Sequence, residues 1–251
     1  SLGETYFSLS LPPASAVPRA TSHDVVILFD TSASQLGPFR DQALAALDAV
    51  LAGLGKNDRA RLLAVDLDAH AMHDSFVAPQ SADMKQALAK LQQRVPLGST
   101  DLNAGLRFAV RCYEQQGDKQ HRGASRAVVY IGDGLSTANF LESKSFAELV
   151  QLLVENRIPI NSFAVGSRTD GRLLAALANQ TGGMLAIAGT LTPEEKGVSK
   201  ARARKEDRRR AAEAGRYLAK AARGVVLWPL ESQWPATLQE IFPKSLPPLR
   251  N

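Results

Sequence analysis

Carboxylate and hydroxyl side chains stand where buried strands are expected to end. The candidate ligands occupy three places: Asp30, Ser32 and Ser34 in DTSAS, Thr100 in PLGSTDLN, and Asp133 in GDG. Apolar runs precede the first and the last of these segments, at 25–29 and 126–131. Two carboxylates and three hydroxyls, with no sulfur or imidazole, suit Mg²⁺, Mn²⁺ or Ca²⁺ and disfavour a structural zinc site. A divalent cation would also remove the repulsion between two neighbouring anions.

The elements that must position these residues alternate along the chain. Short apolar runs predict strands at 24–30, 60–67, 126–132, 158–166 and 183–189. Segments with apolar residues three or four apart predict helices at 38–54, 81–93, 101–116, 143–156 and 170–180. This alternation predicts an α/β fold, a doubly wound, mostly parallel, Rossmann-like sheet with helices on both faces. Ligands in such folds bind at the carboxyl ends of the strands, where the five candidate residues are expected to meet.

The order of these residues resembles the von Willebrand factor type A domain. The metal-ion-dependent adhesion site of that family has the signature D-x-S-x-S, then T, then D, which is filled here by Asp30, Ser32, Ser34, Thr100 and Asp133. The resemblance covers about residues 21–189, including GSTDLNAGL and YIGDG. It implies that the hydroxyls touch the metal directly or through water and that the aspartates orient the waters. It also implies that an acidic side chain of a partner protein completes the shell, in a site that binds and does not catalyse.

Two places near the site depart from the family's pattern. The family commonly has Gly-Ser-Met where this chain has Ala33, Ser34 and Gln35, and a hydroxyl residue at the position of Gly132. Neither departure removes a ligand. If the loop needed a positive φ at residue 33, alanine would be strained there by roughly 1 kcal/mol and the site would be weakened.

Other polar residues have ordinary structural explanations. Asp101 is expected to cap the helix that follows it. In DLDAHAMHD, Asp66, Asp68 and His70 alternate on one face of an extended chain, but no partner cluster accompanies them. A solvated turn that leads to an edge strand is therefore the preferred interpretation. Cys112, the single cysteine, lies in a helical apolar pattern that is typical of a packed core thiol, and it excludes an internal disulfide.

The flanks of residues 21–189 break the alternation. Residues 1–20 contain TYFSLS at 5–10, which alternates like an edge strand, and an extended linker at 11–20. Residues 190–251 contain a basic helix, a short strand expected in GVVLWPL at 224–230, and a proline-rich tail. The helix is expected to dock by an apolar stripe and to hold its polar first half in solvent. The stripe comprises Ala211, Ala214, Leu218, Ala221 and Val225.

The flanking segments add to the resemblance. YFSLSLPP and FPKSLPPL look like the borders of this domain in inter-alpha-trypsin inhibitor heavy chains and related bacterial proteins, which implies a multi-domain parent. The chain begins at Ser1 and ends in FPKSLPPLRN, so we expect a segment of a longer protein. The compartment stays open, with an extracytoplasmic or secreted protein favoured by the resemblance.

Basic residues are concentrated in one segment. The net charge of +5 comes from 30 Lys and Arg and 25 Asp and Glu, and residues 194–223 alone contribute +6. The basic helix 194–223 makes nucleic-acid or anionic-surface binding one alternative function. Against this alternative, Glu206 and Asp207 interrupt its basic part at 200–210, and that part contains no aromatic residue for base stacking. The other alternative is a structural scaffold without metal-mediated recognition, in which DTSAS would only cap a helix.

The sequence lacks the motifs of several other classes. It has no Walker or dinucleotide-binding glycine motif and no nucleophile with an evident base. No apolar stretch approaches the roughly 18 residues of a membrane span, and no signal peptide is evident, so a soluble chain is expected. The sequence therefore predicts a non-catalytic module that binds Mg²⁺, Mn²⁺ or Ca²⁺ and, through it, a protein partner that presents Asp or Glu.

Overall fold

The computed structural model describes residues 8, 20–115, 123–189, 199–229, 234–235, 237–238, 240–242 and 246–250. Apart from residues 8 and 20, the edge strand expected at 5–10 and the linker expected at 11–20 lie outside these residues.

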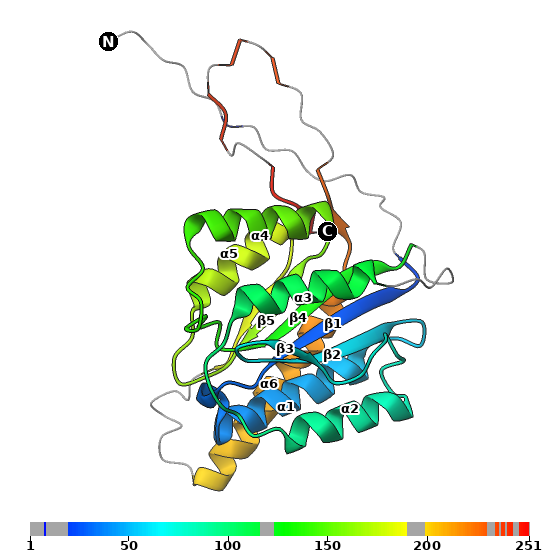
Figure 1. The fold of residues 1–251 in the computed structure, drawn as a ribbon, viewed down its shortest axis with the longest axis vertical. Helices are drawn as coiled ribbons and strands as arrows, with labels where there is room; N and C mark the ends of the chain where they lie inside the picture. Colours follow the sequence, from blue (N-terminus) through cyan, green and yellow to red (C-terminus); the bar gives the residue numbers. More distant parts are fainter. Residues whose placement is uncertain are drawn as a thin grey trace.

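Six strands of the described residues form one sheet in the order β3-β2-β1-β4-β5-β6 (Figure 1). Their bounds are His23–Asp30 (β1), Arg59–Val65 (β2), Ala69–Ala71 (β3), Ser125–Gly132 (β4), Ile160–Ala164 (β5) and Leu185–Ile187 (β6). All neighbouring strands pair in parallel except β3, which pairs antiparallel with β2 at one edge. The predicted doubly wound, mostly parallel sheet is confirmed. The strand order reverses between β1 and β4, which is where such sheets bind ligands.

Helices cover both faces of this sheet. The bounds are Pro38–Gly53 (α1), Ala82–Gln93 (α2), Leu102–Glu114 (α3), Ser143–Glu155 (α4), Gly171–Thr181 (α5) and Lys200–Ala222 (α6), with a 3₁₀ turn at Ala33–Gln35 (η1). Helices α1, α2 and α6 pack on one face, and α3, α4 and α5 pack on the other. No helix in the described part of the chain combines the length and apolar character that a membrane span needs.

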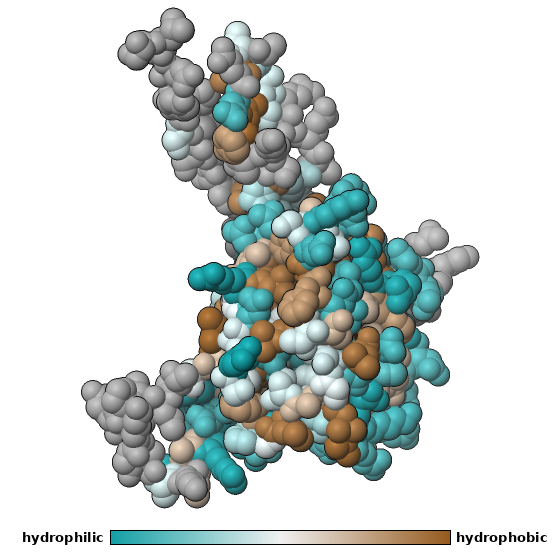
Figure 2. Space-filling view, turned by 60° about the vertical axis from the view of Figure 1, so that its left-hand side comes forward, coloured by the Kyte–Doolittle hydropathy of each residue, from teal (hydrophilic) through white to brown (hydrophobic). Residues whose placement is uncertain are grey.

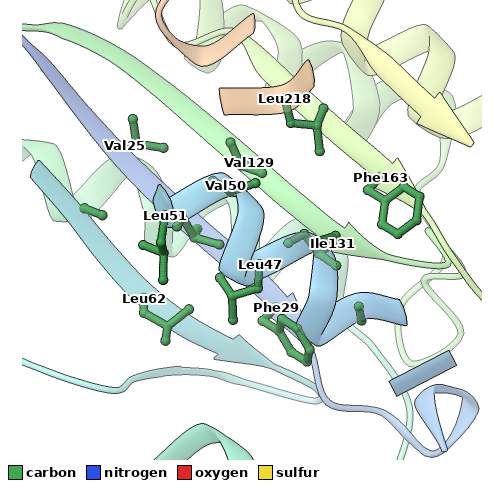
Figure 3. Close-up of a cluster of buried hydrophobic side chains, with 14 of the residues drawn as sticks. Val25, Phe29, Leu47, Val50, Leu51, Leu62, Val129, Ile131, Phe163 and Leu218 are labelled. Atoms are coloured by element: carbon green, nitrogen blue, oxygen red, sulfur yellow. The ribbon is translucent and has the colours of Figure 1, made fainter. Parts of the chain in front are cut away.

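The two faces of β1 contribute to two separate hydrophobic clusters. Val25, Ile27 and Phe29 point to the α1 side, whereas Val26 and Leu28 point to the α3 side, and all are fully buried. Figure 3 shows the first cluster, where Leu47 and Val50 of α1 lie among side chains of the strands. Burial on both faces explains why β1 is a continuous apolar run in the sequence.

Helix α6 docks on α1 through small residues. A Cβ added to Gly215 would lie 2.2 Å from the carbonyl oxygen of Ala46, and one added to Gly53 would lie 2.6 Å from Cβ of Ala219. The backbones of the two helices can approach closely because these two positions are glycine. Residue numbers rise together on both helices at these contacts, so α1 and α6 run in the same direction.

The predicted apolar stripe of α6 is confirmed for four of its five residues: Ala211, Leu218 and Ala221 are buried, and Ala214 is half-buried. The fifth, Val225, is half-buried but lies beyond the end of the helix at Ala222. The polar first half of the helix is mostly exposed, as expected.

A second, two-stranded sheet follows α6. The strand expected at 224–230 is shorter, Val226–Leu227 (β7), and it pairs antiparallel with Leu249–Arg250 (β8), which the sequence did not indicate. Arg250 donates to the carbonyls of Ala221 at 2.7 Å and Gly182 at 3.2 Å, and to Oδ1 of Asn161 at 3.1 Å. The guanidinium of Arg250 thus ties the end of the chain to the domain.

Candidate metal centre

The predicted ligands lie at the carboxyl edge of the sheet. Ile131 of β4 pairs opposite Phe29 of β1, so Asp30 is level with Gly132, and Asp133 follows one residue later. Thr100, just before α3, donates its hydroxyl to both carboxylate oxygens of Asp30 at 3.1 Å. These contacts bring together residues that are separated by as many as 103 positions in the sequence.

The two serines belong to the loop that follows β1. The hydroxyls of Ser32 and Ser34 lie 2.9 Å apart, and the Ser32 N–H donates to Oδ1 of Asp30 at 2.8 Å. Ser32 is buried, whereas Ser34 is exposed. The loop therefore offers one inner and one outer hydroxyl beside the carboxylate of Asp30.

Backbone contacts hold this loop against the loop that carries Thr100. Leu97 N–H donates to the carbonyl of Thr31 at 3.0 Å, and Ala33 N–H donates to the carbonyl of Gly98 at 3.1 Å. Ala33 has no positive φ, since Arg157 is the only non-glycine residue with one among the described residues. The condition under which alanine would strain the loop is therefore not met.

Gln35, at the position where the family commonly has methionine, extends these contacts. Its side chain is fully buried, and Nε2 donates to the carbonyl of Val165, just after β5, at 3.1 Å. The amide thus links η1 to the end of another strand. The sequence had marked this position only as a departure from the pattern.

Tyr130 is part of the site, although the sequence analysis missed it. Its hydroxyl donates to Oδ2 of Asp30 at 2.9 Å and accepts the N–H of Gly134 at 3.1 Å. A Cβ added to Gly132 would lie 2.4 Å from this hydroxyl and 2.5 Å from Cβ of Asp30. Glycine at 132 therefore leaves the space that the phenol and the carboxylate fill. A tyrosine inside an apolar run gave no signal of this role.

The two carboxylates are buried and close enough to affect each other. Burial first, and then the charge of Asp133, raises the pKa of Asp30 from 3.8 to about 6. Asp133 is also buried; Leu135 N–H donates to its Oδ1 at 2.9 Å, but its Oδ2 has no hydrogen-bond partner within the described structure. Buried polar atoms are rarely left without a partner, so this oxygen is a candidate to bind a ligand.

The donor set fits a hard divalent cation. Every candidate ligand atom is oxygen, and the two carboxylates supply at most two negative charges. A cation would reduce the repulsion between the carboxylates of Asp30 and Asp133, and it would give Oδ2 of Asp133 a partner. Zinc sites usually use sulfur or imidazole, and neither group belongs to the candidate set.

The second acidic segment has a structural role instead. Asp66 accepts from Arg94 Nη2 at 2.5 Å and from the hydroxyl of Thr31 at 3.2 Å, which helps to hold the loop after β1. Burial would raise the pKa of Asp66. The hydrogen bonds from Arg94 and Thr31 and the charge of Arg94 act in the opposite direction and keep this pKa below its usual value. His70 lies on β3, so the predicted turn and edge strand are confirmed.

Two further structural predictions are confirmed. Asp101 caps α3, because its Oδ1 accepts the N–H of Ala104 at 2.8 Å. Cys112 is buried in the core between α3 and the sheet, and burial raises the pKa of its thiol. Neither residue therefore needs a functional explanation.

Large apolar side chains surround the candidate site on the surface. They are Leu36 (54% exposed), Leu67 (57%), Val95 (65%), Leu97 (66%) and Phe140 (78%). We call these five residues the apolar rim. Contacts connect their loops to the site: a Cβ on Gly98 would lie 3.9 Å from Leu67, and Ala138 N–H donates to the carbonyl of Thr100 at 3.2 Å. Figure 2 turns the left-hand side of Figure 1 forward, where apolar residues (brown) reach the surface among polar ones.

Comparisons with known proteins agree with this fold. The family profile described as von Willebrand factor type A domain matches residues 23–187. Among solved structures, the chain is similar to a von Willebrand factor type A protein from Catenulispora acidiphila, with a TM-score of 0.58 and 16% identity over 77% of this chain and 43% of that one. The chain thus spans less than half the length of that protein.

Two other solved structures share the fold. An aerotolerance-related membrane protein from Bacteroides fragilis gives a TM-score of 0.55 at 15% identity, with 80% of this chain and 98% of that chain covered. Proximal thread matrix protein 1 from the mussel byssus gives 0.54 at 16% identity, with 80% and 47% covered. At such identities these likenesses describe the fold alone.

Proposed function

This chain belongs to the von Willebrand factor type A domain family, and on that premise we propose that it binds a protein partner through a divalent cation. Domains of this family are typically interaction modules and are usually not catalytic. The observation that carries the proposal is the buried pair of carboxylates, Asp30 and Asp133, in which Oδ2 of Asp133 has no partner among the described residues. The proposed ligands are Asp30, Ser32, Ser34, Thr100 and Asp133, and the proposed cation is Mg²⁺, with Mn²⁺ or Ca²⁺ as alternatives.

The charges of the site favour an acidic partner. When bound, the cation supplies a positive centre that a carboxylate of another protein can ligate. Among the five proposed ligands only Asp30 and Asp133 carry negative charge, because the hydroxyls of Ser32, Ser34 and Thr100 are neutral. Exposed Ser34 lies on the side that an incoming Asp or Glu could reach.

The apolar rim supports a protein as the partner. Exposed apolar side chains that gather around one site commonly mark protein-binding surfaces. Here they lie on the loops that carry or contact Ser34, Thr100 and Asp66. A partner segment with an acidic residue between apolar ones would match both the site and its surroundings.

We also propose that this domain belongs to a multi-domain protein. Flanks that resemble those of inter-alpha-trypsin inhibitor heavy chains support a domain at 21–189 with neighbours on both sides. We expect the metal-mediated contact with the partner to belong to this domain, since the candidate ligands and the rim all lie within it.

Metal binding can be measured on the chain itself. Mn²⁺ titrations followed by electron paramagnetic resonance should show one site in the wild type. Asp133→Asn should lose that site while keeping the shape of the side chain. Asp68→Asn is the matched control, because Asp68 is an exposed aspartate in a turn, and it should bind Mn²⁺ like the wild type. Equal Mn²⁺ binding by all three proteins would contradict the ligand assignment.

Partner binding needs a separate experiment. Extracts of the source cell should be passed over the immobilised chain in Mg²⁺ and then in chelator. A partner that chelator releases, and that Asp133→Asn does not retain, is the expected result. If the same protein stays bound to wild type, Asp133→Asn and Asp68→Asn in chelator, recognition uses another face and the proposal is wrong.

A further inference from the structure

Helix α6 carries its basic half to the same edge of the sheet as the candidate metal centre. Ala219 of α6 contacts Gly53 of α1, and the two helices are parallel. Arg204 precedes Ala219 by as many residues as Pro38 precedes Gly53, so Arg204 lies about level with Pro38, where α1 begins. Helix α1 begins just after the loop that holds Ser32 and Ser34. The first turn of α6 reaches beyond that level, and Figure 1 shows it, in yellow, extending past the rest of the domain. We call residues 200–210 the basic arm.

Two arginines of the basic arm lie on the side of α6 that faces α1. Arg208 and Arg204 precede Gly215 by seven and eleven residues, close to two and three helical turns. Gly215 is the residue whose position contacts Ala46 and Ala49 of α1. Burial raises the pKa of Asp48 on α1, and the charge of Arg208 acts on the same carboxyl in the opposite direction. The side of α6 that faces α1 therefore has small buried residues in the second half of the helix. Near the edge of the sheet that holds the candidate metal centre, the same side has exposed arginines.

The ion pairs within the basic arm do not include Arg204 or Arg208. Arg209 pairs with Glu206 and Glu213, and Arg210 pairs with Glu206, so these charges are balanced within the helix. Arg204 and Arg208 are exposed and form no ion pair with any other residue that the structure describes. Glu206 and Glu213 thus pair with Arg209 and Arg210, whereas Arg204 and Arg208 lie on the side turned to α1, where Asp48 is an acidic neighbour of Arg208.

From this arrangement we infer that Arg204 and Arg208 form a second contact for the acidic partner, beside the metal centre. The inference rests on the proposed function and specifies the partner: it carries several carboxylates, of which one reaches the metal and others reach the basic arm. Complementary charge of this kind increases the association rate and selects acidic partners. A nucleic acid fits less well, because 199–216 has no aromatic residue on which bases could stack.

The experiment uses the full chain and a fluorescein-labelled peptide of ten glutamates, measured by fluorescence anisotropy with Mg²⁺ at low salt. Arg204→Ala/Arg208→Ala should weaken peptide binding about tenfold and reduce its dependence on salt. The matched control is Arg216→Ala/Lys220→Ala, which removes the same charge from exposed positions of the same helix outside the basic arm. It should change the affinity less than about twofold. Circular dichroism should show that both variants keep their helix, since alanine favours helix.

Three outcomes would overturn the inference. Equal losses in the two double variants would mean that the peptide senses only net charge. An unchanged affinity in Arg204→Ala/Arg208→Ala would remove the basic arm from the interface. A labelled oligonucleotide of ten thymidines that binds the wild type more tightly than the peptide would assign the arm to nucleic acid.

Chelator separates this inference from the proposed function. If chelator and Asp133→Asn weaken peptide binding and the arm variant does too, both proposals are supported. If only the arm variant weakens it, the basic arm is supported as a contact for acidic protein and the metal-mediated function is contradicted. If only chelator and Asp133→Asn weaken it, the proposed function stands and the inference is overturned.

Discussion

Tyr130 donates its hydroxyl to Oδ2 of Asp30 across the boundary between β4 and β1, at 2.9 Å. The hydroxyl oxygen of Tyr130 also accepts the N–H of Gly134, in the loop that carries Asp133. One buried phenol thus links the two strand ends from which the candidate carboxylates come. The position of each carboxylate therefore depends on a side chain that is not itself a proposed ligand.

Removing this hydroxyl should destabilise the metal-free chain. Tyr130→Phe takes a donor from the buried carboxylate of Asp30 and an acceptor from the N–H of Gly134. We expect the free energy of unfolding to fall by about 1–3 kcal/mol. Urea denaturation at pH 8 in chelator measures it. Tyr217→Phe, at a 42% exposed position, should leave the free energy unchanged, and a similar small effect for both variants would contradict the role of Tyr130.

The stability of the metal-free chain should depend on pH through Asp30. Its pKa in the folded chain, about 6, exceeds the unfolded value of 3.8 because of burial and of Asp133. A raised folded pKa stabilises the fold below the unfolded pKa, and this contribution is lost as the pH rises through about 6. In chelator, the free energy of unfolding of the wild type relative to Asp30→Asn should fall by up to about 3 kcal/mol between about pH 4 and pH 8.

Urea titrations of both proteins at the two pH values measure this difference. A difference that does not change with pH would mean that Asp30 titrates near its usual value. Added Mg²⁺ should restore stability at pH 8 in the wild type and not in Asp30→Asn, since binding to the folded state alone stabilises it.

Gly132 should tolerate no side chain. The methyl of Gly132→Ala would lie 2.4 Å from the hydroxyl of Tyr130 and 2.5 Å from Cβ of Asp30, so the carboxylate would have to move. We expect a loss of about 1–3 kcal/mol in the free energy of unfolding, together with weaker Mn²⁺ binding. Gly171→Ala is the control, because no atom lies within 4 Å of its added Cβ, and it should unfold like the wild type or slightly later. Equal stability of the two variants would contradict this packing.

Arg250 should hold β8 and the end of the chain against the domain. Arg250→Ala removes hydrogen bonds to Gly182, Ala221 and Asn161, two of them to backbone carbonyls. A fall of about 1–3 kcal/mol in the free energy of unfolding is expected, measured by urea denaturation. Arg172→Ala, an exposed arginine of α5, should have little effect. If removing Arg250 also has no effect, β8 does not stabilise the domain.

The central strands could be predicted from the sequence because burial on both faces makes them continuous apolar runs. The expected strands 24–30 and 126–132 differ from β1 and β4 by one residue each. The outer strands were predicted too long: β5 is Ile160–Ala164 and not 158–166, and β6 is Leu185–Ile187 and not 183–189. Apolar character extends beyond the residues that pair with a neighbour, so hydrophobicity alone does not mark where pairing stops.

The meeting of Asp30, Thr100 and Asp133 could be predicted because the fold class determines where strand ends lie. The contacts of Tyr130 and Gln35 could not, because they depend on register and on partners far away in the sequence. Tyr130 reaches Asp30 only because β4 pairs with β1 with Ile131 opposite Phe29. Strand β8 was missed for the same reason, since two residues in a proline-rich tail have no local pattern that indicates pairing.

Helix α6 is held against α1 only in its second half, where Gly215 and Gly53 let the two backbones approach closely. Because α6 is a rigid helix, the number of residues between this contact and an arginine of the basic arm determines the direction in which that arginine lies around the helix axis. One alanine inserted after Arg210 would turn Arg204 and Arg208 by about 100° around the helix axis, whereas four would turn them by only about 40° and carry them about 6 Å outward. A flexible tether of equal charge would respond to neither insertion. The spacing of seven positions from Arg208 to Gly215 therefore sets the direction in which the molecule presents its positive charge.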